Sequence, residues 1–172
     1  MALDAEAALA QRLADAARTA IMPLFRQGIS SERKADRTPV TEADRAAETA
    51  MRALISEAFP NDAIHGEEFG ATTGSGASSG RTWVLDPIDG TTSFMVGRPI
   101  FGTLVALVAE GWPLLGVIDQ PILRERWVGA TGQPTTLNGQ PAQTRLPSQC
   151  RSARFRCLTG LSPDGRFRST RH

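Results

Sequence analysis

The segment 83–94 reads WVLDPIDGTTSF, a short apolar run followed by two acids and a Gly-Thr-Thr sequence. Its apolar start ends at Asp86 and Pro87, a pattern typical of a strand that stops at its carboxyl end. Asp89 follows three residues after Asp86, so one turn can direct both carboxylates at the same point. Two carboxylates without a basic neighbour repel each other, and a bound divalent cation relieves that repulsion. The segment therefore predicts a metal site.

Further oxygen atoms extend this predicted site. Glu67 and Glu68 form a second acidic pair upstream, and the carbonyl of Ile88 can complete a ligand shell. Oxygen ligands alone favour a hard ion, so Mg²⁺ is expected first and Mn²⁺ second. The backbone N–H groups of Gly90 and Thr91 can receive an anionic oxygen. One Asp-Pro-x-Asp-Gly stretch is often only a turn, but carboxylates, cation and anion nest together indicate phosphate.

Two amphipathic helices are predicted before the motif. Apolar residues recur at helical spacing over about the first 27 residues and again over 41–58. Thr41 is expected to cap the second helix, with Asp44 at the capping-box position. This box competes with any metal role for Asp44. The polar stretch 30–40 between the helices predicts an exposed loop.

Strand patterns follow the second helix. They lie at 63–65, 83–85, 101–109, 114–118 and 126–130. Asn138 and Gly139 indicate one more hairpin turn. Closely spaced strands with tight connections predict an antiparallel sheet. Two helices followed by such a meander define an α+β fold in which the helices cover the sheet.

The net charge of +1 conceals a division of the chain. Residues 1–144 hold 12 of the 19 basic and 17 of the 18 acidic side chains, and residues 145–172 hold seven Arg and one Asp. The second segment has no apolar periodicity and predicts a disordered basic tail. One hypothesis is a tail that contacts nucleic acid or another anionic surface. The other, which we favour, is a GC-rich coding sequence read out of frame.

The two cysteines and the N-terminus bear on the compartment. Cys150 and Cys157 form neither a redox pair nor a recognisable zinc site. The N-terminus carries acids where a secretory signal needs basic residues, and the apolar run 100–109 is too short to span a bilayer. A cytoplasmic protein that does not enter membranes is expected.

The motif at 83–94, with Gly66, Glu67 and Glu68 upstream, resembles the signature of the inositol monophosphatase family of magnesium-dependent, lithium-sensitive small-molecule phosphatases. Further matches are at Lys34, 38–41, Asp44 and 138–139. The resemblance covers residues 1–144. Within the family, the segments 97–104 and 116–129 are most similar to the histidinol-phosphate phosphatase branch. That branch implies histidine biosynthesis, with inositol monophosphate or a related small phosphate ester as the alternative substrate.

The resemblance implies hydrolysis of a phosphate monoester by a metal-activated water. It assigns Glu67, Asp86 and the Ile88 carbonyl to a first metal ion. Asp86 and Asp89 would share a second ion, and Asp44 would support a third, weaker site through water.

The remaining implied roles concern the substrate and the attacking water. Thr91, hydrogen-bonded with Glu67, would orient the water, so Glu67, Asp86 and Thr91 are the expected catalytic residues. The N–H groups of Gly90 and Thr91, together with Asp89, would bind the substrate phosphate. The implied partners are a small phosphorylated metabolite and a second copy of the chain in a homodimer.

The family's layered αβαβα sugar-phosphatase fold is matched only in its first helix-pair and sheet layer. The match fades near Arg145, and no Trp-Asp-x-Ala motif follows. A truncated member with low phosphatase activity is therefore expected, with one sheet face uncovered. The apolar residues expected to be exposed there are Leu104, Leu107, Val117 and Ile118.

A binding protein without catalysis is the alternative from another class. In it the acidic site keeps a metal or phosphate, and the Arg-rich tail contacts nucleic acid. Residues 1–144 are acidic overall, and Trp83, Trp112 and Trp127 are not interleaved with basic residues as a stacking surface requires. Nucleic-acid binding is therefore disfavoured.

Overall fold

The computed structural model describes residues 3–27, 31–33 and 39–143. The chain divides into a compact unit, Met1–Ala142, and a segment, Gln143–His172, of which only Gln143 is described. The segment 145–172, which was predicted to be disordered and holds both cysteines, therefore lies outside the described residues. Lys34 does so too. Among the helices that are described, none has the length and apolar character needed to cross a membrane.

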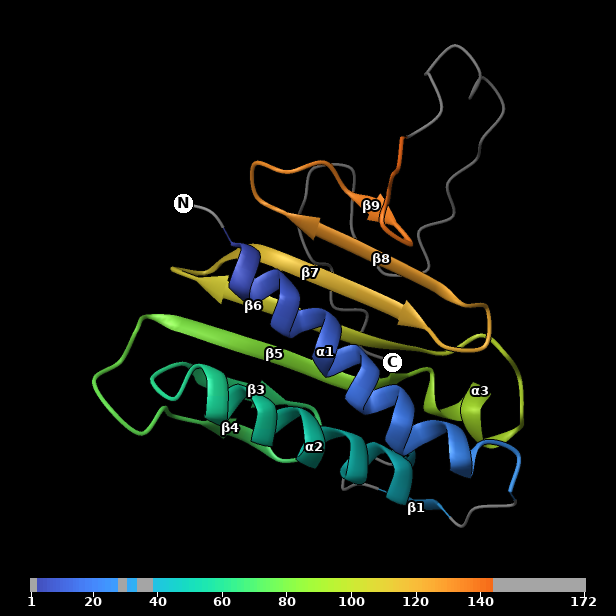
Figure 1. Ribbon diagram of the computed structural model, residues 1–172. Coiled ribbons are helices and arrows are strands. Elements are labelled where there is room, and N and C mark those ends of the chain that lie inside the picture. Colours follow the sequence, from blue (N-terminus) through green and yellow to red (C-terminus); the bar gives the residue numbers. More distant parts are fainter. Residues whose placement is uncertain (1–2, 28–30, 34–38, 144–172) are drawn as a thin grey trace, which may run out of the picture. The chain divides into compact units, whose positions relative to one another are not determined.

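Two long helices lie side by side on one face of a sheet (Figure 1). Helix α1 spans Asp4–Ile21 and continues into the 3₁₀ helix η1, Met22–Leu24, and helix α2 spans Glu42–Ala58. The predicted capping box of α2 is confirmed, since the Thr41 N–H and hydroxyl donate to Asp44 Oδ2 at 2.8 and 2.6 Å. Both predicted helices are therefore present.

The segment between the helices differs from the predicted loop. Strands β1, Ser31–Arg33, and β2, Pro39–Thr41, pair antiparallel and form a two-stranded sheet of their own. The loop prediction was wrong for the five positions 31–33 and 39–40, because the polar composition of 30–40 does not reveal the backbone pairing between its two ends.

An eight-stranded sheet forms the second layer, in the order β10-β9-β8-β7-β6-β5-β3-β4. Its strands are β3 (Ala63–Gly66), β4 (Gly70–Thr72), β5 (Arg81–Asp89), β6 (Gly102–Ala109), β7 (Trp112–Gln120), β8 (Glu125–Ala130), β9 (Thr136–Leu137) and β10 (Gln140–Pro141). Neighbouring strands run antiparallel, as predicted, except that β3 and β5 are parallel. The predicted hairpin at 138–139 joins β9 and β10.

The core lies between the helix pair and one face of the sheet. Alternate residues of the three central strands point into it and are almost fully buried. They are Trp83, Leu85, Val105, Leu107, Leu115 and Val117. The predicted exposure of Leu107 and Val117 was therefore wrong, because the two-residue period of a strand directs them at the helices. Ile118, 48% exposed, lies on the opposite face as predicted, and Leu104 there is partly exposed.

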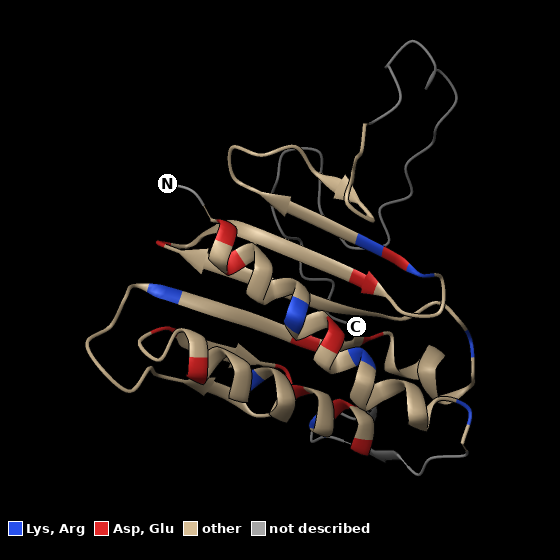
Figure 2. Ribbon diagram, viewed as in Figure 1, with Lys and Arg blue, Asp and Glu red and all other residues tan. Residues whose placement is uncertain are grey.

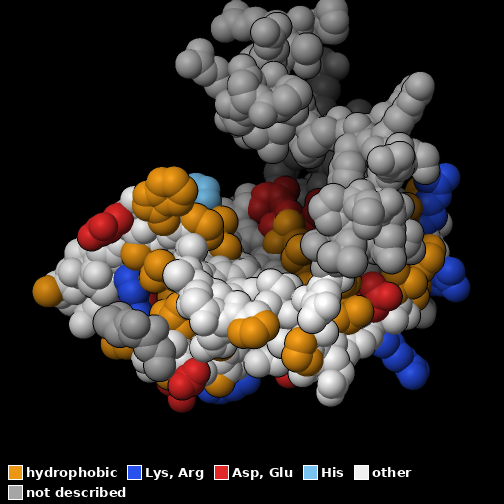
Figure 3. All heavy atoms as spheres, turned by 90° about the horizontal axis from the view of Figure 1, so that it is seen from above, with side chains coloured by type: hydrophobic (Ala, Val, Ile, Leu, Met, Phe, Trp, Pro, Cys, Tyr) orange, Lys and Arg blue, Asp and Glu red, His pale blue; other side chains and the backbone are white. Residues whose placement is uncertain are grey.

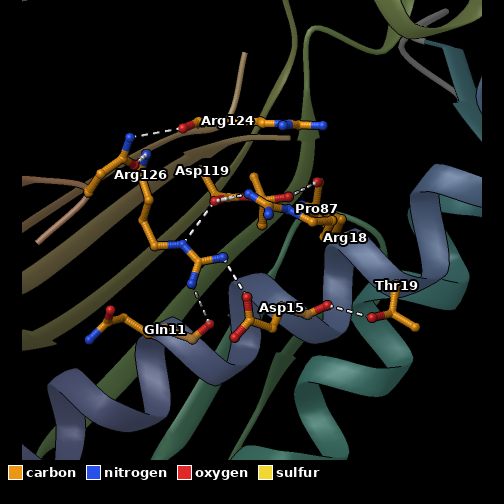
Figure 4. Close-up of polar contacts among 10 residues, drawn as sticks. Gln11, Asp15, Arg18, Thr19, Pro87, Asp119, Arg124 and Arg126 are labelled. Atoms are coloured by element: carbon orange, nitrogen blue, oxygen red, sulfur yellow. Dashed lines mark hydrogen bonds and ion pairs between the residues drawn. The ribbon is translucent and has the colours of Figure 1, made fainter. Parts of the chain in front are cut away.

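Buried ion pairs fasten the helix layer to the sheet. The carboxylate of Asp119, at the end of β7, is fully buried and accepts from Arg18 Nη2 at 2.8 Å and Arg126 Nε at 2.8 Å. Figure 4 shows this carboxylate between the two guanidinium groups, with Arg126 reaching on to Asp15 of α1. These contacts fix where α1 crosses the strand ends.

Candidate active site

The parallel pairing of β3 and β5 brings the two acidic motifs together. Gly66 is the register partner of Leu85, and the Glu67 N–H donates to the Leu85 carbonyl at 3.1 Å. The next residues along the two strands, Glu67 and Asp86, therefore lie next to each other where the pairing of β3 and β5 ends. Parallel strands end at the same edge of a sheet, which is why the pairing direction decides this contact.

A bulge in β5 directs Asp86 and Asp89 to the same side. Asp86 pairs with Leu104 and Asp89 pairs with Gly102. The chain thus advances three residues on β5 while it advances only two on β6. In a regular strand, residues three apart point to opposite faces, and one extra residue reverses that relation. The predicted strand end at Asp86 was therefore wrong, since β5 runs on through the bulge to Asp89.

Within the bulge, the Pro87 carbonyl accepts a hydrogen bond from a side chain. The Thr103 hydroxyl, on the neighbouring strand β6, donates to it at 2.8 Å and is buried with it. Thr103 was missed at the sequence level. A threonine inside the otherwise apolar run 101–109 was the available signal.

The electrostatics of Asp86 differ from those of an ordinary surface acid. Burial, followed by a hydrogen bond with the side chain of Glu67 and the charge of Glu67, raises the pKa of Asp86 to about 8. The charges of Asp89 and Asp44 act in the same direction. Four carboxyl groups predicted from the sequence therefore act on one another in the folded chain.

Asp44 completes the capping box of α2 and also lies close enough to Glu67 and Asp86 for its charge to act on theirs. It is 1% exposed, and burial, with a smaller effect from the charge of Glu67, raises its pKa. Figure 2 shows acidic positions along α2 and within β5. A water-mediated metal contact of Asp44 stays a prediction.

The turn after β5 leads into the short helix α3, Thr91–Met95. Gly90 precedes it with a φ of +92°, a left-handed conformation that favours glycine. The Thr91 hydroxyl donates to the Ile88 carbonyl at 3.1 Å. The predicted Thr91 contact with Glu67 and the phosphate contacts of Gly90 and Thr91 stay predictions.

An aromatic cluster holds α3 against the end of η1. The ring centroids of Phe25 and Phe94 lie 5.7 Å apart, and Phe101 lies 5.3 Å from each of them. Arg26 adds two donor contacts, at 3.0 and 2.9 Å, to the Gly97 carbonyl. The turn that carries Asp89 and Thr91 is thus tied to packed structure on its far side.

In the described part of the chain, no three acidic, His or Cys side chains already converge as a finished metal site. The residues nevertheless fit a divalent ion, since Asp86 Oδ1 is buried without a hydrogen-bond partner and other carboxylates surround it. Figure 3 shows acidic side chains gathered in a hollow beside apolar ones.

The structure has a helix pair on a mostly antiparallel sheet, and acidic residues gather where a parallel strand pair ends. This is the arrangement of the sugar-phosphatase class of α+β folds. The chain belongs to the inositol monophosphatase family, whose model matches residues 3–169.

Individual relatives agree with this assignment. The chain is 50% identical over 143 residues to the chloroplastic bifunctional phosphatase IMPL2 of Arabidopsis thaliana, covering 83% of this chain and 41% of that protein. It is 43% identical to the histidinol-phosphatase of Chlorobaculum parvum over 78% of this chain and 51% of that one. A solved inositol monophosphatase from Zymomonas mobilis is 49% identical, with a TM-score of 0.70 over 84% of this chain and 55% of that one. The chain thus spans about half the length of these relatives.

Proposed function

We propose that the acidic site binds a divalent cation, Mg²⁺ or Mn²⁺, together with a phosphate monoester, and that it belongs to a histidinol-phosphate phosphatase. The observation that carries the proposal is the buried Asp86 Oδ1, which has no hydrogen-bond partner while Glu67, Asp89 and Asp44 surround it with negative charge. A buried acceptor without a partner is costly, and a hard cation satisfies it.

Asp86 is the central ligand in this proposal, with Glu67 on one side and Asp89 on the other. The Ile88 carbonyl, already held by the Thr91 hydroxyl at 3.1 Å, is the fourth oxygen. When bound, the cation supplies positive charge that offsets the phosphate and makes a coordinated water more acidic. Asp44 acts at longer range because its Oδ2 is occupied by Thr41.

The substrate phosphate is assigned to the turn at Gly90 and Thr91. The left-handed φ of Gly90 reverses the chain there, so the N–H groups that follow belong to a turn rather than to a strand ladder. The Thr91 hydroxyl lies at the same turn and is assigned to orient the attacking water. Asp89 contributes to binding the ester through the cation.

Histidinol phosphate is the favoured substrate because a histidinol-phosphatase is among the similar proteins and because segments 97–104 and 116–129 resemble that branch. Inositol monophosphate is the alternative, supported by the similarity to an inositol monophosphatase. Both are phosphate monoesters of small polar molecules, so the metal and phosphate contacts proposed above serve either.

The test measures binding before turnover. Mn²⁺ is titrated into the purified chain and into Asp86→Asn, followed by water proton relaxation. Binding that depends on Asp86 supports the proposal, and equal binding by the two proteins contradicts it.

Phosphate release is then assayed with Mg²⁺ and three esters in parallel: histidinol phosphate, inositol monophosphate and adenosine 3′,5′-bisphosphate. Turnover greatest with histidinol phosphate and lost in Asp86→Asn supports the favoured substrate. Asp86-dependent metal binding without turnover of any ester would instead favour the non-catalytic binding protein.

A further inference from the structure

Helix α2 directs a second buried acid, Glu48, at the acidic site, one turn after Asp44. The side chain of Glu48 is fully buried. Its Oε2 accepts from the Glu68 N–H at 2.7 Å, and its Oε1 accepts from the Phe69 N–H at 3.2 Å. One carboxylate therefore holds two successive backbone groups of the turn after β3.

The same carboxylate explains the glycine at the start of this turn. A Cβ on Gly66 would lie 1.9 Å from Glu48 Oε1, so any larger residue displaces the carboxylate. The Glu67 N–H, between these contacts, donates to the Leu85 carbonyl at 3.1 Å. Three consecutive N–H groups, from residues 67 to 69, are thus held, the first by the Leu85 carbonyl and the other two by Glu48.

Arg52 offsets the negative charge of the buried Glu48 carboxylate. Its Nε donates to Glu48 Oε1 at 2.7 Å, and its other nitrogens contact the Gly70 carbonyl and, at 3.0 Å, Thr72 Oγ1. A buried charge persists when it is paired and its oxygens accept further hydrogen bonds, as they do here. Asp44, Glu48 and Arg52 are spaced four residues apart and share one face of α2.

We propose that Glu48 is a positioning residue for the metal site: by fixing the backbone of residues 66–69 it determines where Glu67 places its carboxylate beside Asp86. The inference rests on the proposed function for its metal-binding consequence. It assigns Glu48 no contact with the cation or the substrate. Groups that orient metal ligands commonly change metal affinity about ten- to a hundredfold when they are replaced.

The test compares Glu48→Gln with a matched control in the full chain. Glu57→Gln makes the same change at an exposed position of the same helix. Glu48→Gln should speed amide exchange at Glu68 and Phe69 about tenfold or more and weaken Mn²⁺ binding about ten- to a hundredfold. Glu57→Gln should change neither.

Two further variants separate positioning from general loss of stability. Ile55→Val trims the core side of α2 without touching the turn, so it should lower stability and leave Mn²⁺ affinity unchanged. If Glu48→Gln does not fold, Gly66→Ala displaces the carboxylate while keeping every acid, and it should show the same faster exchange and weaker binding.

Unchanged exchange at Glu68 and Phe69, or unchanged Mn²⁺ affinity in a folded Glu48→Gln chain, would overturn the inference. Absence of Mn²⁺ binding in the wild-type chain would contradict the proposed function instead. The exchange rates, which need no metal, would then decide by themselves whether Glu48 holds the turn.

Discussion

Asp86 is an acid whose surroundings oppose its ionisation. Burial is the largest cause, and the neighbouring Glu67 both shares a hydrogen bond with it and adds negative charge. The protonation of Asp86 therefore depends on the neighbouring acids Glu67, Asp89 and Asp44, which the fold brings near it. A divalent cation competes with the proton at the same oxygen atoms.

The first prediction concerns pH and stability in the metal-free chain. Because the pKa of Asp86 rises from 3.8 to about 8 on folding, the folded chain keeps a proton that the unfolded chain has lost between those values. The stability associated with this proton is present below 3.8 and is lost as pH rises toward 8. Asp86→Asn removes that loss, so the variant should gain stability relative to wild type as pH rises. Urea unfolding in EDTA at about pH 5 and pH 8 measures this, and a difference independent of pH would contradict it.

The second prediction concerns Thr103. Thr103→Val keeps the shape of the side chain but leaves the buried Pro87 carbonyl without its donor, which should cost about 1–3 kcal/mol of unfolding free energy. Because the bulge sets the direction of Asp86 and Asp89, Mn²⁺ affinity should fall as well. Thr103→Ser keeps the hydroxyl and should retain the affinity. Urea unfolding and Mn²⁺ titration of both variants check this, and equal affinities would count against the role.

At the scale of elements, the helices are placed by a few buried ion pairs as well as by apolar packing. Asp62, after α2, accepts from Arg81 Nε at 3.1 Å and from Trp83 Nε1 at 3.0 Å. Arg81 also contacts Glu6 of α1 at 2.6 Å. Asp119 ties the other end of α1 to β7 and β8. Each pair joins segments far apart in the sequence.

The third prediction tests the cluster at Asp119. Asp119→Asn leaves Arg18 and part of Arg126 without their buried partner, which should cost about 3 kcal/mol of unfolding free energy. Asp15→Asn is the matched control, because Asp15 pairs with the same Arg126 but its side chain is 62% exposed. Its replacement should cost about 1 kcal/mol or less. Thermal and urea unfolding of the two variants distinguish these values, and equal losses would be the contrary result.

At the scale of the molecule, the two faces of the sheet differ. The helices cover one face, and the other carries partly exposed apolar side chains around a cavity of about 530 Å³, lined by Val84, Leu104, Ile118 and Trp127. Asp86 lines the same cavity. The acidic site therefore borders the apolar face on the side of the sheet away from the helices.

The fourth prediction uses two neighbouring residues to test this difference. Val117→Thr places a hydroxyl in the core at a 1% exposed position, and Ile118→Thr makes a polar change at a 48% exposed one. Val117→Thr should cost about 1–3 kcal/mol of unfolding free energy, while Ile118→Thr should change it by about 0.5 kcal/mol or less. Urea unfolding compares them, and a larger loss at Ile118 would show that the assigned faces are reversed.

Most elements could be predicted from local pattern. The helices followed from apolar residues at helical spacing, and the cap of α2 followed from Thr41 and Asp44, because a capping box involves only residues close in sequence. Strand pairing could not be predicted in the same way. Hydrogen bonds between β1 and β2, or between β3 and β5, join segments whose own sequences do not specify the partner or its direction.

The sequence alone determined the acids of the candidate site, the family resemblance, the two long helices and the main strands, because these reside in residue types and short spacings. Only the tertiary structure decided how the acids meet. The parallel register of β3 and β5 stands Glu67 beside Asp86, and the bulge in β5 turns Asp89 to the same side. The buried contacts of Thr103 and Glu48 support these two arrangements. Both arrangements depend on hydrogen bonds between distant segments, so the local sequence around each acid could not reveal them.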